Sequence, residues 1–234
     1  MAKKVTVGLC TSGTRLKVAA YDGEKTAQAR KKVFNQEKYL FALLKKVLGG
    51  KELREVGAVC AARGPGRFTG IRIALTLAGT LKALSGAKVY TATLFEILAL
   101  QAAETAHFKK SGLKRVVVLL HAFKDEYFCQ SFTAGGKLPR PDGEPVWLKA
   151  EALKALLAGQ ARPFYAVADA EEEPGIYGLL PGGAVKAPPA VSKIIPSYII
   201  KTALAHKNQT LKPLYLKPAK YELENNVRPE PAKK

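Results

Sequence analysis

Cysteine and histidine are scarce in this chain of 234 residues, with three of each. An odd number of cysteines, set far apart in apolar strand-like stretches, favours buried thiols in a reducing compartment over disulfides or a zinc cluster. The histidines are isolated and show neither H-x-x-x-H nor C-x-x-C spacing, so the sequence predicts no metal site of its own. The cysteines are Cys10, Cys60 and Cys129, and the histidines are His107, His121 and His206.

Long hydrophobic runs are also missing, although 47% of the residues are hydrophobic. No stretch is long enough to span a membrane. Residues 1–4 lead directly into a strand-like alternation without the pattern of a signal peptide, so we expect a cytoplasmic protein with no membrane partner. No serine lies in a G-x-S-x-G setting, which argues against a serine hydrolase.

Acidic residues are few beside basic ones. The chain has 38 Lys and Arg against 19 Asp and Glu, a net charge of +19. Residues 1–110 hold 20 basic and 7 acidic side chains, whereas residues 111–234 hold 18 and 12. This excess favours a polyanionic partner, either RNA or an acidic protein, although a role in solubility alone stays open.

Hydrophobic periodicity in the first half predicts an alternation of strands and helices. Three antiparallel strands open the chain, with Asp22-Gly23 as a hairpin turn. The first helix follows Asn35 as N-cap and ends at Gly49-Gly50. The expected strands are 5–10, 15–21, 25–34, 56–62 and 87–91, and the expected helices are 36–48, 70–85 and 93–107.

The second half repeats this alternation of strands and helices less completely. Its expected strands are 114–120, 126–132, 144–148 and 163–168, and its expected helices are 149–159 and 197–207. Residues 171–196 are rich in Glu, Pro and Gly and give no assignment. The repetition predicts two lobes, 1–105 and 106–220, followed by a mobile tail over 221–234.

The chain is organised around the stretch Val59 to Ile73, in which an apolar run meets a loop of glycines and one proline. Gly64 and Gly66 permit backbone conformations that a Cβ forbids, and Thr69 is the candidate N-cap of the next helix. Backbone N–H groups at such a helix start suit an anion. The candidate phosphate site consists of Thr11, Ser12, Gly64, Gly66 and Thr69. The spacing matches neither the P-loop nor G-x-G-x-x-G, so a simple strand-to-helix turn remains an alternative.

This loop resembles the Gly-Pro-Gly-Ser-Phe-Thr-Gly-Leu-Arg-Ile-Gly signature of the TsaB family. Here the residues from Gly64 read Gly-Pro-Gly-Arg-Phe-Thr-Gly-Ile-Arg-Ile, with Arg67 in place of serine and Ile71 in place of leucine. Residues 212–218 resemble the family's Pro-Leu-Tyr-Leu-Arg-Pro ending. The resemblance implies an α/β fold of two ribonuclease-H-like lobes of the actin and sugar-kinase superfamily, with mixed central sheets flanked by helices.

Two other family elements are altered. Cys10 stands where the family start, Leu-Ala-Ile-Asp-Thr-Ser, has aspartate, and a neutral thiol does not hold a hard cation as a carboxylate does. His121 and Phe123 replace Asp and Arg of a second element, Asp-Ala-Arg-x-x-Glu-Val-Tyr, while Glu126 is kept. The change at Cys10 argues against phosphoryl-transfer chemistry by the chain itself, and we predict no catalytic residue. His121 and Phe123 replace two charged groups, so the polar network of the second element is not expected to be kept.

The resemblance implies a non-catalytic scaffold subunit of the machinery that forms threonylcarbamoyladenosine on tRNA. It would pair with a TsaD-like catalytic subunit and a TsaE-like ATPase, which would hold ATP or ADP and metal, and it would have no cofactor of its own. We expect Arg63, Arg67 and Arg72 to contact tRNA or a partner within the complex.

The helices 36–48 and 70–85 are apolar nearly all round, which a helix with one buried face is not. The sequence therefore predicts that they dock against a partner, or against a second copy when the chain is alone, unless their own lobe covers them. The predicted interface residues are Leu40, Phe41, Leu44, Ala74, Leu77, Ala78 and Leu81. Two other functions remain open: a basic RNA-binding pseudoenzyme, and a nucleotide-binding enzyme of the kinase superfamily.

Overall fold

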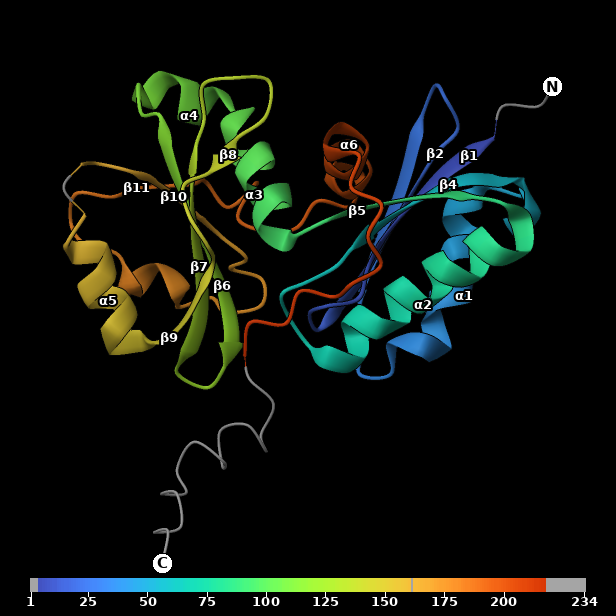
Figure 1. Ribbon diagram of the computed structural model, residues 1–234, viewed down its shortest axis with the longest axis horizontal. Coiled ribbons are helices and arrows are strands. Elements are labelled where there is room, and N and C mark those ends of the chain that lie inside the picture. Colours follow the sequence, from blue (N-terminus) through green and yellow to red (C-terminus); the bar gives the residue numbers. More distant parts are fainter. Residues whose placement is uncertain (1–3, 161, 218–234) are drawn as a thin grey trace, which may run out of the picture.

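A computed structural model describes residues 4–160 and 162–217 and contains two mixed β-sheets (Figure 1). The first sheet has the order β3-β2-β1-β4-β5. Strands β1, β2 and β3 are antiparallel, whereas β4 and β5 run parallel to β1. Its strands are β1 (Val5–Cys10), β2 (Arg15–Tyr21), β3 (Thr26–Lys32), β4 (Val56–Ala62) and β5 (Lys88–Ala92).

The second sheet repeats this arrangement. Its order is β11-β10-β6-β7-β8, with β9 also paired to β7. An antiparallel hairpin, β6 with β7, continues into parallel pairing of β6 with β10 and of β10 with β11. The strands are β6 (Arg115–Phe123), β7 (Glu126–Thr133), β8 (Arg140–Pro141), β9 (Val146–Lys149), β10 (Tyr165–Ala168) and β11 (Val185–Lys186). This duplication of ribonuclease-H-like sheets confirms the predicted fold class.

Helices complete five layers, because each sheet buries an apolar face on both sides. On the outer side of the first sheet lie α1 (Gln36–Leu48) and α2 (Phe68–Ser85), in one buried cluster with β1, β2 and β4. Helix α5 (Ala150–Ala158) covers the outer side of the second sheet with the short 3-10 helix η2 (Ile176–Leu179). The other elements are η1 (Leu53–Glu55), α3 (Leu94–Ala103), α4 (Ala106–Ser111) and α6 (Pro196–His206).

Helices α3 and α6 form the central layer between the two sheets (Figure 1). Each follows the last strand of one sheet and packs on the other sheet: α3 contacts β6 and β10, and α6 contacts β1, β2, β4 and β5. The predicted first lobe, 1–105, thus contains a helix that covers the second sheet. A division at residue 105 does not separate the two packing units.

The helix ends follow their capping residues. Gly49 and Gly86 end α1 and α2 in the left-handed conformation that glycine adopts without strain. Asn35 precedes α1 as predicted, although its side chain makes no capping hydrogen bond. The N-cap prediction for Thr69 was wrong: α2 begins at Phe68 with Arg67 as N-cap. The predicted helix 93–107 is two helices, because Thr93 and Thr105 each cap a separate one.

A C-terminal strap, residues 207–217, runs back across the molecule after α6. Thr91 N–H in β5 donates to the Asn208 carbonyl at 2.7 Å, and Leu214 N–H donates to the Arg63 carbonyl at 2.7 Å. Lys217 Nζ then lies 2.5 Å from Glu126 Oε2 at the start of β7. The strap therefore contacts both sheets and the glycine loop. The predicted tail, 221–234, lies outside the described residues.

Candidate functional site

A cleft of about 290 Å³ lies between the two sheets, where the ends of β1, β4, β6 and β10 meet. One wall comes from the turn after β1 and the glycine loop after β4, and the other from the β6–β7 hairpin and the acidic segment after β10. The polar and charged lining residues include Ser12, Lys17, Arg67, His121, Asp169 and Glu172.

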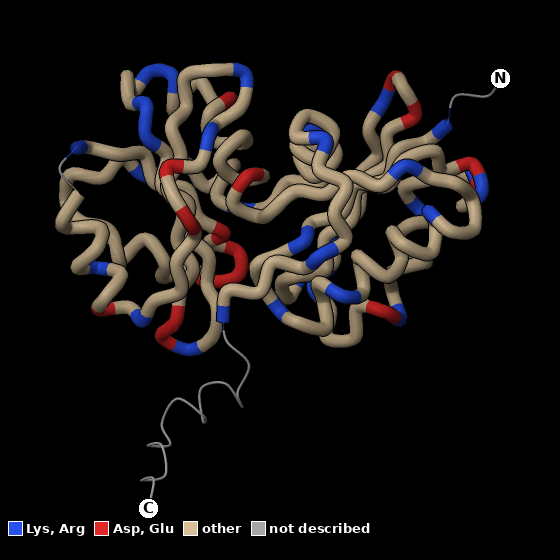
Figure 2. The backbone as a smooth tube through the Cα atoms, in the orientation of Figure 1, with Lys and Arg blue, Asp and Glu red and all other residues tan. Residues whose placement is uncertain are grey.

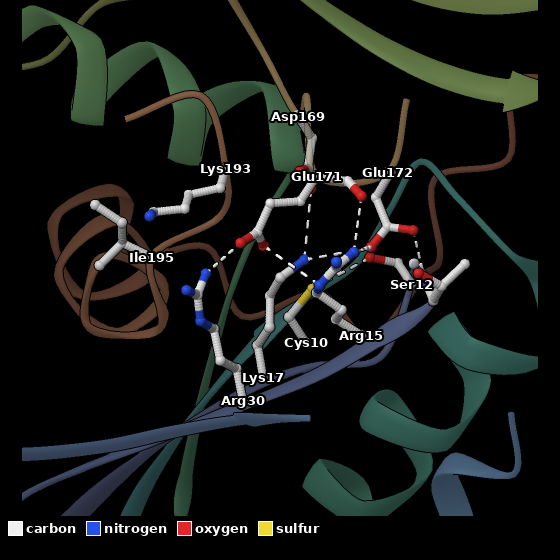
Figure 3. Close-up of polar contacts among 12 residues, drawn as sticks. Cys10, Ser12, Arg15, Lys17, Arg30, Asp169, Glu171, Glu172, Lys193 and Ile195 are labelled. Carbon is white, nitrogen blue, oxygen red and sulfur yellow. Dashed lines mark hydrogen bonds and ion pairs between the residues drawn. The ribbon is translucent and has the colours of Figure 1, made fainter. Parts of the chain in front are cut away.

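Lys17 places a buried ammonium group at the base of this cleft (Figure 3). Its side chain is 1% exposed, and its Nζ lies 3.4 Å from Asp169 Oδ2 and 3.7 Å from Glu172 Oε1. Lys17 belongs to the first sheet, whereas both carboxylates belong to the segment after β10. The ion pairs therefore join the two lobes through groups that water does not screen.

The electrostatics of the cluster favour the charged forms of Lys17 and Glu172. Burial alone lowers the pKa of Lys17, but the acidic groups around it, Asp169 first among them, outweigh this and raise its pKa. Burial alone raises the pKa of Glu172, but Lys17 and a hydrogen bond from Thr14 together lower its pKa. Burial raises the pKa of Asp169, although Lys17 acts to lower it. Lys17 therefore stays a cation at neutral pH, with Glu172 as its charged partner.

Further contacts extend the cluster along the acidic segment. Thr14 N–H donates to Glu172 Oε2 at 2.7 Å, and Arg15 Nη1 donates to the Glu171 carbonyl at 2.7 Å. Arg30 also forms an ion pair with the Glu171 carboxylate. In Figure 2 the acidic positions of this segment face the first lobe, on which basic positions outnumber acidic ones. The second lobe thus supplies acids to a basic surface of the first.

The glycine loop after β4 packs against the turn after β1. A Cβ at Gly66 would lie 2.5 Å from the Ser12 carbonyl oxygen, and one at Gly70 would lie 1.9 Å from the Thr11 carbonyl oxygen. Arg67 N–H donates to the Ser12 carbonyl at 2.7 Å. The glycines thus allow two backbone segments to touch.

The candidate phosphate site is not assembled as predicted. Thr11 is fully buried, and its Oγ1 donates to the Gly70 carbonyl at 2.5 Å. Ser12 is 2% exposed and its hydroxyl lies 3.3 Å from Cys10 Sγ. Gly64 is buried and Thr69 is exposed on α2 outside the cleft lining. The hydroxyls of Thr11 and Ser12 thus have partners within the protein. Of the five predicted residues, Ser12 and Gly66 line the cleft.

The three predicted arginines differ in exposure. Arg63 is half-buried, and its Nε has no hydrogen-bond partner among the described residues. Arg67 is exposed and lines the cleft. Arg72 is exposed on α2, with its guanidinium carbon 3.9 Å from the centre of the Phe68 ring. Arg67 and Arg72 are therefore available to a ligand.

The altered residues of the second family element lie on the β6–β7 hairpin. His121 Nε2 lies 2.9 Å from the Lys124 carbonyl oxygen, which fixes its ring within the turn. Phe123 is 57% exposed and, like His121, lines the cleft. A bulky apolar side chain thus occupies the cleft wall at this position.

The predicted interface is largely wrong, because six of its seven side chains are buried within the first lobe. They pack with β1, β2 and β4 in one apolar cluster, and η1 covers another side of α2. Phe41, the seventh, is 57% exposed on α1. The buried six are Leu40, Leu44, Ala74, Leu77, Ala78 and Leu81.

Sequence reasoning missed the Lys17 cluster, although two signals point to it. Lys17 is a lone charge within the apolar strand Leu16 to Ala20, and residues 171–173 are an acidic run in a basic chain. Either pattern alone fits a solvated surface. Lys17 pairs with Glu172 of this run and with Asp169 just before it. Lys17 and Asp169 are 152 positions apart, which no local pattern reveals.

The three cysteines are buried free thiols. Burial raises the pKa of Cys60 and of Cys129 to about 12, so both thiols are protonated and unreactive at neutral pH. Within residues 4–160 and 162–217, no three His, Cys, Asp or Glu side chains are grouped so as to hold a metal ion. In the same part of the chain, none of the helices has the length and apolar character needed to cross a bilayer.

No family model and no curated protein matches this sequence. Solved structures do match. A crystal structure described as an uncharacterized protein with similarity to peptidase YEAZ from Pseudomonas aeruginosa has a TM-score of 0.70 at 20% identity, covering 92% of this chain and 100% of that chain. YeaZ from Pseudomonas aeruginosa has a TM-score of 0.69 at 22% identity, covering 91% of this chain and 100% of its own. The chain thus has a two-lobed α/β fold like that of these proteins.

Proposed function

We propose that this chain is a TsaB-type subunit, a non-catalytic scaffold of the cytoplasmic complex that forms threonylcarbamoyladenosine on tRNA. Its fold is like that of the YeaZ proteins, which are TsaB homologues. The observation that carries the proposal is the signature at Gly64 to Ile73, whose residues make specific backbone contacts in the structure. Its glycines join β4 and α2 to the turn after β1.

The charge balance of the cleft supports a non-catalytic role. Phosphoryl transfer needs cations that are free to neutralise the phosphates. Here the buried ammonium of Lys17 is already paired with Asp169 and Glu172, and Cys10 stands in the position of the family's aspartate. The cluster serves to hold the lobes together, and ATP or ADP and metal would be bound by partner subunits.

A TsaD-like subunit would dock on the outer face of α1 in this proposal, and a TsaE-like ATPase would join the pair. Phe41 is the anchor that the structure leaves available, since it is 57% exposed. In the absence of TsaD, the same face would form a homodimer. Ala74 and Ala78 are buried at 1% and 0% exposure, so arginine at either position would disrupt the core rather than report on docking.

Co-purification with a TsaD-like protein, followed by reconstitution of threonylcarbamoyladenosine on tRNA, tests the proposal. We expect the chain to form a stable complex and to be required for the modification. Phe41→Glu should weaken the complex at least about tenfold, because it puts a charge into an apolar contact. Leu156→Glu is the matched control: Leu156 is 41% exposed on α5 of the other lobe, and its replacement should leave pairing unchanged.

Two outcomes would contradict this assignment. If the chain neither pairs with TsaD nor supports the modification, it is not a TsaB-type subunit. If the isolated chain hydrolyses ATP with metal, and Lys17→Met abolishes turnover without unfolding the protein, the nucleotide-binding enzyme is the better description.

A further inference from the structure

Three exposed aromatic side chains lie beside the cleft. Phe68 at the start of α2 is 52% exposed, Tyr215 in the strap is 40% exposed, and Phe123 on the β6–β7 hairpin is 57% exposed. Large exposed aromatic side chains that gather in one place mark an interaction surface rather than ordinary surface scatter.

Two of these rings form a stack with a cation. The rings of Phe68 and Tyr215 are stacked with centroids 4.9 Å apart. The guanidinium carbon of Arg72 lies 3.9 Å from the centre of the Phe68 ring, and Arg72 Nε donates to Tyr215 Oη at 3.2 Å. The three side chains therefore hold one another in place, and both rings remain partly exposed.

The third ring forms a second group with lysines. Lys124 and Lys217 Nζ each lie 5.5 Å from the centre of the Phe123 ring. Lys217 Nζ is also 5.5 Å from the ring of Trp147, the single tryptophan of the chain. Aromatic faces and cations therefore alternate here as well.

The strap joins the two groups into one aromatic–cationic band. Tyr215 and Lys217 are two residues apart on this extended segment, and Arg67 and Phe123 line the same cleft. In Figure 1 the end of the strap lies near both the β6–β7 turn and the start of α2. We define the band as Arg67, Phe68, Arg72, Phe123, Lys124, Tyr215 and Lys217.

The charge of the band indicates which kind of ligand it binds. It contains four basic residues. Asp125 and Glu126 lie beside it, and Glu126 is 15% exposed and paired with Lys217. Asp169 and Glu172 line the same cleft as Arg67 and Phe123, and both are paired with Lys17. The net charge of the chain is +19. A positive surface interleaved with exposed rings fits a polyanion that also offers flat faces.

We propose that this band binds single-stranded RNA, with unpaired bases stacked on Phe68–Tyr215 and Phe123 and phosphates on the arginines and lysines. Stacking is possible for bases that are not held inside a duplex, and every base has a π-face, so the site recognises unpaired bases without a fixed sequence. This inference goes beyond the proposed function and does not depend on it, because it concerns binding by the chain alone.

Fluorescence anisotropy of the full chain with a labelled single strand of about 12 nucleotides tests the inference. We expect saturable binding that weakens steeply between about 50 and 200 mM salt, and tighter binding to the single strand than to the same strand in a duplex. Trp147 provides a second readout, since RNA on the band should change its emission.

The double variant Phe68→Ala, Tyr215→Ala removes the stack and keeps every charge. We expect it to weaken binding at least about tenfold. Phe68→Tyr with Tyr215→Phe keeps both rings and should retain binding, which separates stacking from misfolding. The matched control is Tyr39→Ala, because Tyr39 is a 39% exposed aromatic residue on α1 that lies 3.9 Å from Lys31 Nζ and belongs neither to the band nor to the cleft lining. Its replacement should change binding by less than about twofold.

Equal binding of single strand and duplex, or equal loss from Tyr39→Ala, would show attraction by charge alone and overturn the proposal. Undetectable RNA binding at low salt would also overturn it, and a protein that cross-links to the band instead would identify a protein-docking surface. Failure of the TsaD pairing assay leaves this test untouched, so the two hypotheses can fail separately.

Discussion

The loops after β4 and after β10 occupy equivalent positions in the two sheets but have opposite character. Residues 63–67 read Arg-Gly-Pro-Gly-Arg, whereas residues 169–173 read Asp-Ala-Glu-Glu-Glu. The first loop packs backbone against backbone on the turn after β1. The second sends carboxylates across the cleft to Lys17, Arg15 and Arg30.

The helices that follow these loops differ as well. After the glycine loop the chain forms α2 with 18 residues, whereas after the acidic segment it forms η2 with four. The complete lobe thus provides a broad helical outer face, and the shortened lobe provides the acids that hold it. The two loops thus carry opposite charge, although both halves of the chain are basic.

The largest expected effect comes from removing the cation that the acidic loop binds. Lys17→Met should lower the free energy of unfolding by about 3–5 kcal/mol, because Asp169 and Glu172 would remain in a buried site without their ammonium partner. Urea unfolding followed by circular dichroism measures this.

Two further variants sharpen that result. Lys17→Met combined with Asp169→Asn should recover part of the loss, since one buried charge is removed along with its partner. Lys32→Met, at an exposed lysine of β3, should change stability by less than about 0.5 kcal/mol. An effect of Lys17→Met as small as that of Lys32→Met would mean that the acidic loop does not hold the lobes.

The second largest effect on stability is expected at the contact between the glycine loop and the turn after β1. Gly70→Ala should destabilise the protein by about 2–3 kcal/mol, although alanine normally stabilises a helix, because its Cβ would lie 1.9 Å from the Thr11 carbonyl oxygen. Gly79→Ala in the same helix meets its nearest atom, Leu211 Cδ1, at 3.6 Å and should stabilise by about 0.5–1 kcal/mol. Thermal melts of both variants show whether the steric clash or helix propensity determines the change in stability at each position. A change of the same sign in both variants would contradict this prediction.

The smallest effect is a pH dependence carried by Glu172. Its pKa is lowered from 4.5 in the folded protein, so the unfolded chain takes up a proton first as the pH falls. Glu172→Gln should therefore cost about 1.5 kcal/mol at pH 7, and its deficit relative to the natural chain should shrink as the pH falls below about 4.5. Melting temperatures of both proteins from pH 7 to pH 3.5 test this, and a constant deficit would contradict it.

Local patterns predicted the elements well where the contacts are local. Strands 15–21 and 56–62 and helix 36–48 were predicted with the observed bounds. The excess apolar surface of α2 was assigned to a partner, yet the sheet, η1 and Leu211 of the strap cover it. That cover comes from distant segments, and periodicity reports only how much surface is apolar.

The candidate site was predicted less well for a related reason. Arg67 and Arg72 are exposed as expected, whereas the hydroxyls of Thr11 and Ser12 contact other groups within the protein. The rings of Phe68 and Tyr215 are 147 positions apart in the sequence, and they stack because the strap returns to α2. The sequence supplied the residue types, and the long-range topology decided which of them meet.

The exchange of α3 and α6 between the lobes has a consequence for synthesis of the chain. The face of the first sheet that Ile199, Ile200 and Ala203 cover belongs to strands that end at Ala92. These strands leave the ribosome more than a hundred residues before α6, so an apolar sheet face stays uncovered while the second lobe is being made. Neither half can complete its own core, and the two lobes must reach the native state together.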